Sequence, residues 1–345
     1  APAPPTPGPP APAGDALLPR HGVETGGAFA CGIAQNGAVC WGAGATGITA
    51  VEGTAGITQL TVGRAHACGL LAGGRAVCWG DNKLGQLGSG SAGGTTPSPV
   101  AGDLSFTSIS AGAAHTCGLA GGKAYCWGKG KEGQLGDGTG DDRKRPVAVK
   151  GGKSFVAISA GGDHSCAITS SGKAYCWGDG FSGQLGFGGQ DQQLQPGDVS
   201  GSQKYERIAA GGKHTCALAA GGKIYCWGAN ESGQVGDGSK SDRSTPEAVS
   251  SGATFTDISA GANHSCGLTA GGEVLCWGEN RNGQLGDGTK NDRNKPVAVT
   301  GGQGFASVSC AMTRGGEALC WGRNDRGQLG DGTTTPRGTP GPVRP

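Results

Sequence analysis

The sequence predicts an all-β repeat protein made of seven copies of one short unit. Each of the seven tryptophans lies in a Cys-Trp-Gly tripeptide, and a second cysteine precedes the cysteine of each tripeptide by 9 or 10 residues. The steps between successive tryptophans are 38, 48, 50, 50, 50 and 44 residues. A repeat of this length indicates an array or a propeller, in which each unit packs on its neighbours because it cannot bury a core alone.

The repeat divides the chain into two parts. Residues 1–20 are rich in Pro, Ala and Gly and are expected to form an extended, polyproline-like tail. Residues 21–345 contain the seven repeats. Because the chain begins at Ala1 rather than at Met, we expect it to have been processed or trimmed.

Composition narrows the class of protein. Glycine accounts for 74 of 345 residues, but it falls at fixed repeat positions, which disordered sequence would not show. The net charge is +2 with no basic run, so no nucleic-acid partner is expected. No stretch reaches about 18 apolar residues, so no membrane span is expected.

Each unit reads as short strands between glycines. In the sixth copy these runs are 255–259, 264–269, 273–277 and 296–299. No apolar period of 3.6 residues appears, and glycine interrupts the sequence every 5 to 10 residues, so the strands predict an all-β unit.

The cysteine spacing fits a β-hairpin. Pairing Cys166 with Cys176 leaves the three-residue loop 170–172, and pairing Cys117 with Cys126 leaves the two-residue turn 121–122. Both spacings place the two cysteines directly opposite each other, within reach of a disulfide. The same spacing predicts seven hairpin disulfides: Cys31–Cys40, Cys68–Cys78, Cys117–Cys126, Cys166–Cys176, Cys216–Cys226, Cys266–Cys276 and Cys310–Cys320.

Two other interpretations of the cysteines stay open. Buried free thiols would place the protein in the cytosol, and zinc sites could use a histidine such as His164 beside Cys166 and Cys176. No C-x-x-C spacing occurs, which disfavours zinc. Seven disulfides would imply an oxidising, extracytoplasmic location: secreted, cell-surface, periplasmic or in an endomembrane lumen.

The recurring run I-S-A-G-x-x-H-[ST]-C-x-L, followed by Y-C-W-G-x-N-x-x-G-Q-L-G-D-G-T and R-x-x-P-x-x-V, resembles the repeat of the regulator of chromosome condensation family. The resemblance is clearest over residues 105–300. It implies a seven-bladed β-propeller of four-stranded blades, in agreement with the seven Cys-Trp-Gly units. The doubled cysteine is similar to extracytoplasmic variants of the family rather than to its nuclear member.

The two ends of the chain depart from the repeat. Residues 340–343 resemble the Pro-x-x-Val strand and are expected to pair with the first repeat, so that both termini share one blade. The first repeat lacks the G-Q-L-G-D-G segment, and the seventh lacks the residues that match 260–265. The last blade is therefore deformed, or residues are missing between Ser309 and Cys310.

The recurring polar residues are interpreted as structural. The histidine of A-G-x-x-H occurs in five copies beside glycine and is expected to bond neighbouring backbone; catalysis needs unlike groups in unlike roles. Arginines such as Arg143 and Arg293 are expected to pair with Asp142 and Asp292 of their own loops. No motif of a hydrolase, kinase or metalloprotease appears, so we expect no enzyme, no metal and no cofactor.

The resemblance implies protein binding through the turns between Gly and His. The candidate partner-binding residues there are Phe29, Arg64, Asp163, Lys213 and Asn263, and Phe181 stands out on the connections expected at the opposite face. Without Trp or Tyr these turns suit a weak, multivalent or assembly-type contact. Two sequons, at Asn230 and Asn263, are possible glycosylation sites.

The sequence thus predicts an exported, non-catalytic protein-binding or structural module that binds a protein partner or self-assembles. The alternatives are a secreted enzyme inhibitor and a guanine-nucleotide exchange factor for a small GTPase. The cysteines argue against the second alternative, because it would act under reducing conditions.

Overall fold

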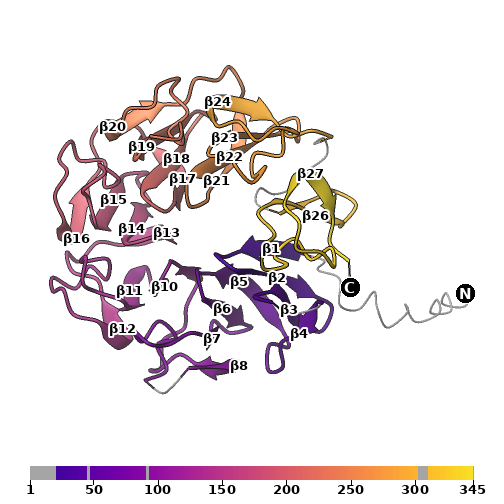
Figure 1. Ribbon diagram of the computed structural model, residues 1–345. Helices are drawn as coiled ribbons and strands as arrows, with labels where there is room; N and C mark the ends of the chain where they lie inside the picture. Colours follow the sequence, from indigo (N-terminus) through magenta and orange to yellow (C-terminus); the bar gives the residue numbers. More distant parts are fainter. Residues whose placement is uncertain (1–20, 45–46, 91–92, 302–309, 345) are drawn as a thin grey trace, which may run out of the picture.

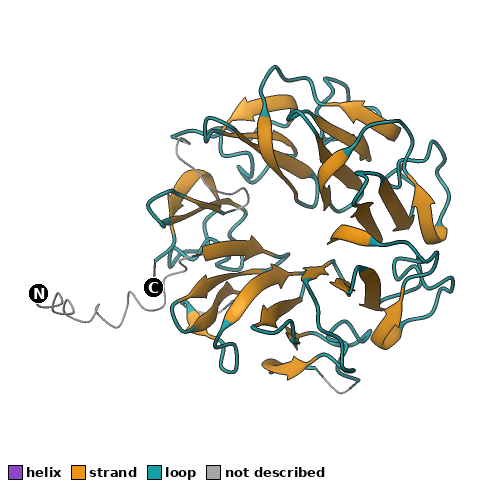
Figure 2. Cartoon of the chain, turned by 180° about the vertical axis from the view of Figure 1, so that it is seen from behind, coloured by secondary structure: helices purple, strands orange, loops and turns teal. Residues whose placement is uncertain are grey.

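Seven antiparallel sheets lie side by side around a central axis (Figure 1). The computed structural model describes residues 21–44, 47–90, 93–301 and 310–344. Each sheet is one blade made of consecutive strands, and all secondary structure within these residues is β (Figure 2). The predicted all-β, seven-bladed propeller is confirmed.

The first three blades follow the chain in order. Their strands are β1 (His21–Thr25), β2 (Phe29–Ala34), β3 (Gly37–Gly42) and β4 (Thr49–Ala50); β5 (Ile57–Val62), β6 (His66–Leu71), β7 (Ala76–Gly80) and β8 (Gly94–Pro99); and β9 (Ser108–Ala111), β10 (His115–Ala120), β11 (Lys123–Gly128) and β12 (Arg143–Ala148).

Blades 4 to 7 continue the same order. Their strands are β13 (Phe155–Ala160), β14 (His164–Thr169), β15 (Ala174–Gly178) and β16 (Gln193–Asp198); β17 (Tyr205–Ala210), β18 (His214–Ala219), β19 (Ile224–Gly228) and β20 (Arg243–Ala248); β21 (Phe255–Ala260), β22 (His264–Thr269), β23 (Val274–Gly278) and β24 (Arg293–Ala298); and β25 (Ala311–Met312), β26 (Ala318–Gly322) and β27 (Arg337–Pro342).

The central hairpin of each blade has the predicted register. Cys166 pairs with Cys176 and Ser165 with Trp177, so cystine and tryptophan point to opposite faces of the sheet. Gly172 closes the loop with a φ of 83°, a conformation that glycine adopts without strain. All fourteen cysteines form the seven predicted disulfides, with Cα atoms 4.0–4.1 Å apart.

The core is divided into layers between neighbouring blades. Trp177 of blade 4 packs against the Cys117–Cys126 cystine of blade 3, together with Leu135 and Phe155. The same arrangement recurs where Trp127 meets the preceding cystine. Each blade therefore presents its cystine to the next blade and its tryptophan to the previous one. A single blade buries neither face by itself, which is why the units must form a ring.

The strand order gives the propeller two different ends. We call one the turn face: it carries the turn between the first and second strands of each blade and the long loop between the third and fourth. The other is the hairpin face, which carries the cystine hairpins and the connections to the next blade. Backbone bonds join the elements of each end, from Asp179 N to Asp163 O on the turn face and from Tyr205 N to Gly172 O on the hairpin face.

The ring closes differently from the prediction. Strand β27 pairs with β26, with Cys320 opposite Gly341, and not with the first blade. In blades 2 to 7 the Pro-x-x-Val run begins within the outermost strand of its own repeat, so each terminus stays in its own blade. Residues 302–309, which include the suspected gap before Cys310, lie outside the described residues.

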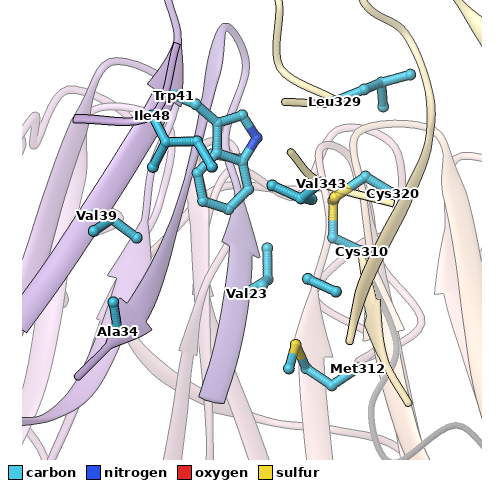
Figure 3. Close-up of a cluster of buried hydrophobic side chains, with 12 residues drawn as sticks. Val23, Ala34, Val39, Trp41, Ile48, Cys310, Met312, Cys320, Leu329 and Val343 are labelled. Carbon is cyan, nitrogen blue, oxygen red and sulfur yellow. A yellow bond between two sulfur atoms is a disulfide. The ribbon is translucent and has the colours of Figure 1, made fainter. Parts of the chain in front are cut away.

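Side-chain packing joins blade 7 to blade 1 instead of a shared sheet. Val343 and the Cys310–Cys320 cystine lie against Trp41 and Val23 (Figure 3). The Trp41 indole donates a hydrogen bond of 2.9 Å to the carbonyl of Gln328, 287 residues later in the chain. The closing layer therefore uses the same cystine-to-tryptophan contact as the other layers.

Candidate protein-binding face

The turns of the turn face bond to one another around the axis. Ala113 N donates to Gly161 O at 2.9 Å, Gly162 N to Gly211 O at 2.9 Å, and Gly212 N to Gly261 O at 3.1 Å. These bonds run from one blade to the next, so the turns of blades 3 to 6 form a connected backbone rim rather than separate loops.

The small residues of these turns are required by that packing. A Cβ on Gly162 would collide with the carbonyl of Gly212, and a Cβ on Gly212 with the carbonyl of Ala262. Packing therefore excludes a side chain at Gly162 and Gly212, whereas the equivalent positions of other blades hold Arg64, Ala113 and Ala262.

The histidines link neighbouring blades through a repeated hydrogen-bond chain. In blade 3, His115 Nε2 lies 2.9 Å from Ser165 Oγ of blade 4. Ser165 donates to the Gln134 carbonyl at 2.9 Å, and this carbonyl also accepts a bond of 3.0 Å from Trp177 Nε1. Because the serine proton is already donated, Nε2 must carry the imidazole proton.

The same chain recurs at four interfaces. The contacts are His66 with Thr116, His115 with Ser165, His164 with Thr215, and His214 with Ser265, all at 2.8–2.9 Å. The histidines thus bond a side chain of the next blade and not the neighbouring backbone that we expected. These contacts join neighbouring blades; that the histidines have no catalytic part stays a prediction.

Burial keeps these imidazoles neutral. Desolvation lowers the pKa of His66 and His164 to about 4, and that of His115 and His214 to about 3. In the same four rings Nδ1 has no hydrogen-bond partner among the described residues. The glycine of A-G-x-x-H makes room for the ring, since a Cβ on Gly112 would strike His115. Four similar neutral rings supply no acid–base asymmetry.

The aspartates and arginines brace the long loops. Asp287 pairs with Arg293 at 3.0 Å, while Asn280 Nδ2 donates to Asp287 at 2.9 Å. Burial works to raise the pKa of Asp287, but hydrogen bonds from Thr289, Asn280 and Arg293 outweigh it and lower the pKa.

The predicted ion pairs form in the expected loops, but with a different aspartate from the one named in the prediction. Arg143 and Arg293 pair with Asp137 and Asp287 of the Gly-Asp-Gly turn. Asp292 instead accepts a hydrogen bond of 2.8 Å from the backbone of Asn280. The Asp292 carboxylate thereby holds the start of the long loop and does not pair with Arg293.

The predicted partner-binding residues gather on the turn face, with one exception. Arg64, Lys213 and Asn263 are exposed, and Asp163 is partly buried because it pairs with Lys129 at 2.8 Å. Phe29 instead packs against the core between blades 1 and 2. It is therefore a partly buried packing residue at the position where blades 2 to 6 carry histidine.

Phe181 lies on this same face, not on the opposite connections where we expected it. It follows β15, and its loop is tied to the turn of its own blade through Asp179. Its side chain is 65% exposed. The equivalent loop tips in the neighbouring blades are the exposed Lys131 and Glu231, which the sequence analysis missed although the repeat alignment contains them.

The two sequons differ in access. Asn230 is fully buried, and its Nδ2 donates to Asp237, Ser239 and the carbonyl of Ser241. Asn263 is exposed, with Nδ2 at 3.2 Å from Glu279. The folded chain therefore presents Asn263 to solvent and holds Asn230 inside its loop.

The first strand of each four-stranded blade lies nearest the central axis (Figure 1). These inner strands carry charged side chains that were not among the predicted site residues. Arg207 of β17 lies 3.6 Å from Asp257 of β21. Desolvation by the surrounding protein, and then the charge of Asp257, raise the pKa of Glu24 to about 7, although solvent still reaches this side chain.

Two searches of the described residues bear on metals and membranes. They contain no group of three or more His, Cys, Asp or Glu placed to hold a metal ion. They also contain no helix long and apolar enough to cross a membrane.

Comparisons with known proteins agree with the architecture. The structure of human WBSCR16 superposes with a TM-score of 0.79 at 22% identity, covering 87% of this chain and 84% of that one. The structure of yeast RCC1 (Prp20), solved bound to Kap60, superposes with a TM-score of 0.75 at 20% identity, covering 89% of this chain and 83% of that one. The ectodomain of the Physcomitrella patens receptor kinase CR4 superposes with a TM-score of 0.53 at 26% identity, covering 75% of this chain and 63% of that one.

The sequence comparisons point the same way. No curated protein sequence matches the chain significantly. The family model described as the RCC1-like domain matches residues 28–344, nearly the whole repeat region. The chain therefore belongs to the RCC1-like domain family.

Proposed function

We propose that this chain is an exported, non-catalytic protein-binding or structural module that meets its partner, or a second copy of itself, through the turn face. The observation that carries the proposal is the rim of hydrogen-bonded turns in blades 3 to 6, which holds a rigid surface beside the exposed Lys213 and Phe181. A surface fixed in advance loses little entropy on binding.

The seven disulfides support an extracellular site of action, because such bonds persist in oxidising compartments. The likeness to a receptor-kinase ectodomain supports the same location. The test is the intact mass of the protein from its native source after alkylation without reduction. No alkylated thiol is expected, and a mostly alkylated protein would refute export.

A second experiment tests the face. Phe181→Ala is compared with Val156→Ala, which removes an exposed apolar side chain from the hairpin end of the inner strand β13. Sedimentation and cross-linking in the native extracellular fluid should show weaker self-association or partner capture for Phe181→Ala alone. Equal behaviour of the two variants would remove the turn face from the proposal.

A small-GTPase regulator is the second candidate. It is favoured by the likeness to yeast RCC1 (Prp20), whose structure report includes its binding properties toward Gsp1p and histones. At 21% identity this likeness carries the fold alone, and the disulfides disfavour a reducing compartment. Accelerated nucleotide release from a small GTPase would support this candidate against the first.

A further inference from the structure

One position of the cystine hairpin carries a cation in four consecutive blades. This residue follows the hairpin turn directly, and its carbonyl accepts a backbone bond from the opposite strand, as Lys173 does from Thr169 and Lys223 from Ala219. All six members in blades 2 to 7 are exposed on the hairpin face. In order they are Arg75, Lys123, Lys173, Lys223, Glu273 and Glu317.

The charge of this ring therefore changes sign around the propeller. Blades 2 to 5 form a positive arc, which the blade connections extend with Lys153 and Lys204. Blades 6 and 7 carry glutamates at the same position.

Most of the arc is not neutralised within the protein. Among the described residues, Lys173 pairs with Asp198 at 2.7 Å, whereas Arg75, Lys123 and Lys223 have no ion pair. The other carboxylates on this side of blades 2 to 5, Asp103, Glu206 and Glu247, also lie beyond ion-pair distance of any described cation. Most cations of the arc are therefore available to a ligand.

Part of the arc is held in place. The ammonium of Lys153 lies 4.3 Å from the centre of the Tyr175 ring, and that of Lys173 lies 5.4 Å from it. Contacts of a cation with an aromatic face restrict long lysine side chains. Blade 4 thus presents two positioned cations between the neighbouring Lys123 and Lys223.

We propose that the positive arc, defined as Arg75, Lys123, Lys153, Lys173, Lys204 and Lys223, binds an acidic polysaccharide, a sulfated or uronic-acid glycan of the extracellular space. Packed sheets are spaced about 10 Å apart, close to the Debye length at physiological salt. Small anions would meet each cation singly, whereas a chain spanning several blades engages them together and releases its counterions.

Nucleic acid fits the arc less well. Single strands need exposed aromatic side chains for base stacking, and the one large aromatic exposed among the described residues, Phe181, lies on the turn face. Duplex grooves are read by helices or ribbons, and hairpin turns of two or three residues do not reach into them. A charged glycan needs neither feature.

The test uses the whole, disulfide-bonded protein on immobilised heparin. Lys123→Ala/Lys223→Ala should elute at clearly lower salt than wild type, and the slope of log affinity against log salt should fall by about two. The matched control is Lys240→Ala/Lys290→Ala, which removes two exposed lysines from turn-face loops and should elute like wild type. Glu273→Lys should extend the arc and raise the eluting salt.

Two results would overturn the proposal. Equal shifts for both double variants would mean that net charge, not the arc, governs retention. Tighter binding to a DNA duplex of similar charge than to heparin, lost in Lys123→Ala/Lys223→Ala, would assign the arc to nucleic acid. Thiol alkylation before reduction verifies that every variant has formed its disulfides. Neither result bears on the turn face, so this inference stands or fails separately from the proposed function.

Discussion

The buried histidine and its hydroxyl partner act as one unit between blades. His164 Nε2 and Thr215 Oγ1 lie 2.8 Å apart, and both side chains are fully buried. Between blades 1 and 2 the same two positions hold Phe29 and Ala67, an apolar pair. The same contact between blades is therefore made by a polar pair at one interface and by an apolar pair at another.

This comparison predicts strong coupling between the two positions. Thr215→Ala alone should lower the free energy of unfolding by about 1–3 kcal/mol, because it leaves the buried N–H of His164 without an acceptor. Adding His164→Phe should recover part of that loss, since the double variant copies Phe29 and Ala67. Urea unfolding of the four proteins gives the coupling energy, and strictly additive losses would contradict the unit.

The lowered histidine pKa values predict a loss of stability in mild acid. The pKa of His115 and His214 is about 3 in the folded protein, against about 6.5 in an unfolded chain. Below pH 6.5 the unfolded chain binds more protons, so the free energy of unfolding falls as the pH drops from about 6.5 toward 3.

Urea unfolding at pH 7 and pH 5 measures this effect. Each neutral histidine should contribute a loss on the order of 1–2 kcal/mol between these values. The His164→Phe/Thr215→Ala protein should show a smaller loss, by one histidine's share. Equal stability at pH 7 and 5 would mean that the rings are not buried in the neutral form.

At the scale of the element, the long loop of each blade supports the next blade. Gly138 N donates to the carbonyl of Leu194 in the outer strand β16, and the equivalent Gly188 N to Ser244. The outer strands of blades 2 to 7 carry a proline at one shared position, such as Pro196 in β16, which limits pairing with further strands. The loops thereby join the blades while the edges stay closed to other chains.

Substitution of one glycine of this loop should destabilise the protein by more than the strain of its backbone conformation alone. Gly136 has a φ of 65°, and a Cβ there would lie 2.7 Å from Trp177 Nε1. Gly136→Ala should cost the strain of a positive φ, about 1–2 kcal/mol, and a further 1–3 kcal/mol for displacing the indole.

Gly151→Ala is the matched control. Gly151 has a φ of 93° and open space around it, so the substitution should cost only the backbone strain. Thermal unfolding separates the two costs, and tryptophan fluorescence should change for Gly136→Ala alone. Similar melting temperatures would argue that the loop yields and the indole keeps its place.

For the whole molecule, closure of the ring depends on side chains instead of a shared sheet. Trp41, Val23 and Val343 meet at this layer with the last cystine. As at every other layer, no sheet is shared between the two blades in the described residues, but here no chain connection joins them either, because blade 1 begins the repeats and blade 7 ends them.

Trp41→Ala should therefore open the ring more readily than the same change in an inner layer. Loss of the indole removes the bond to Gln328 and leaves a cavity, at a cost of about 3–5 kcal/mol. Trp177→Ala should cost a similar amount, but blades 3 and 4 stay joined by the chain that runs from β12 to β13. Solution scattering should show an increased radius for Trp41→Ala, and an equal increase in both variants would place the weak point elsewhere.

The sequence alone determined the number of blades, the disulfide pairing and the hairpin register. These follow from local rules, because a spacing of 9 or 10 residues closes one hairpin whatever surrounds it. The repetition of the histidine in five copies also predicted that it serves the structure.

The tertiary structure decided everything that depends on contacts between blades. It placed the Pro-x-x-Val strand in its own repeat, gave Asp137 and not Asp142 to Arg143, and moved Phe181 to the turn face. It also assembled the positive arc from residues about 50 positions apart. A sequence pattern records which residues recur, but their neighbours across a blade are fixed only when the ring forms.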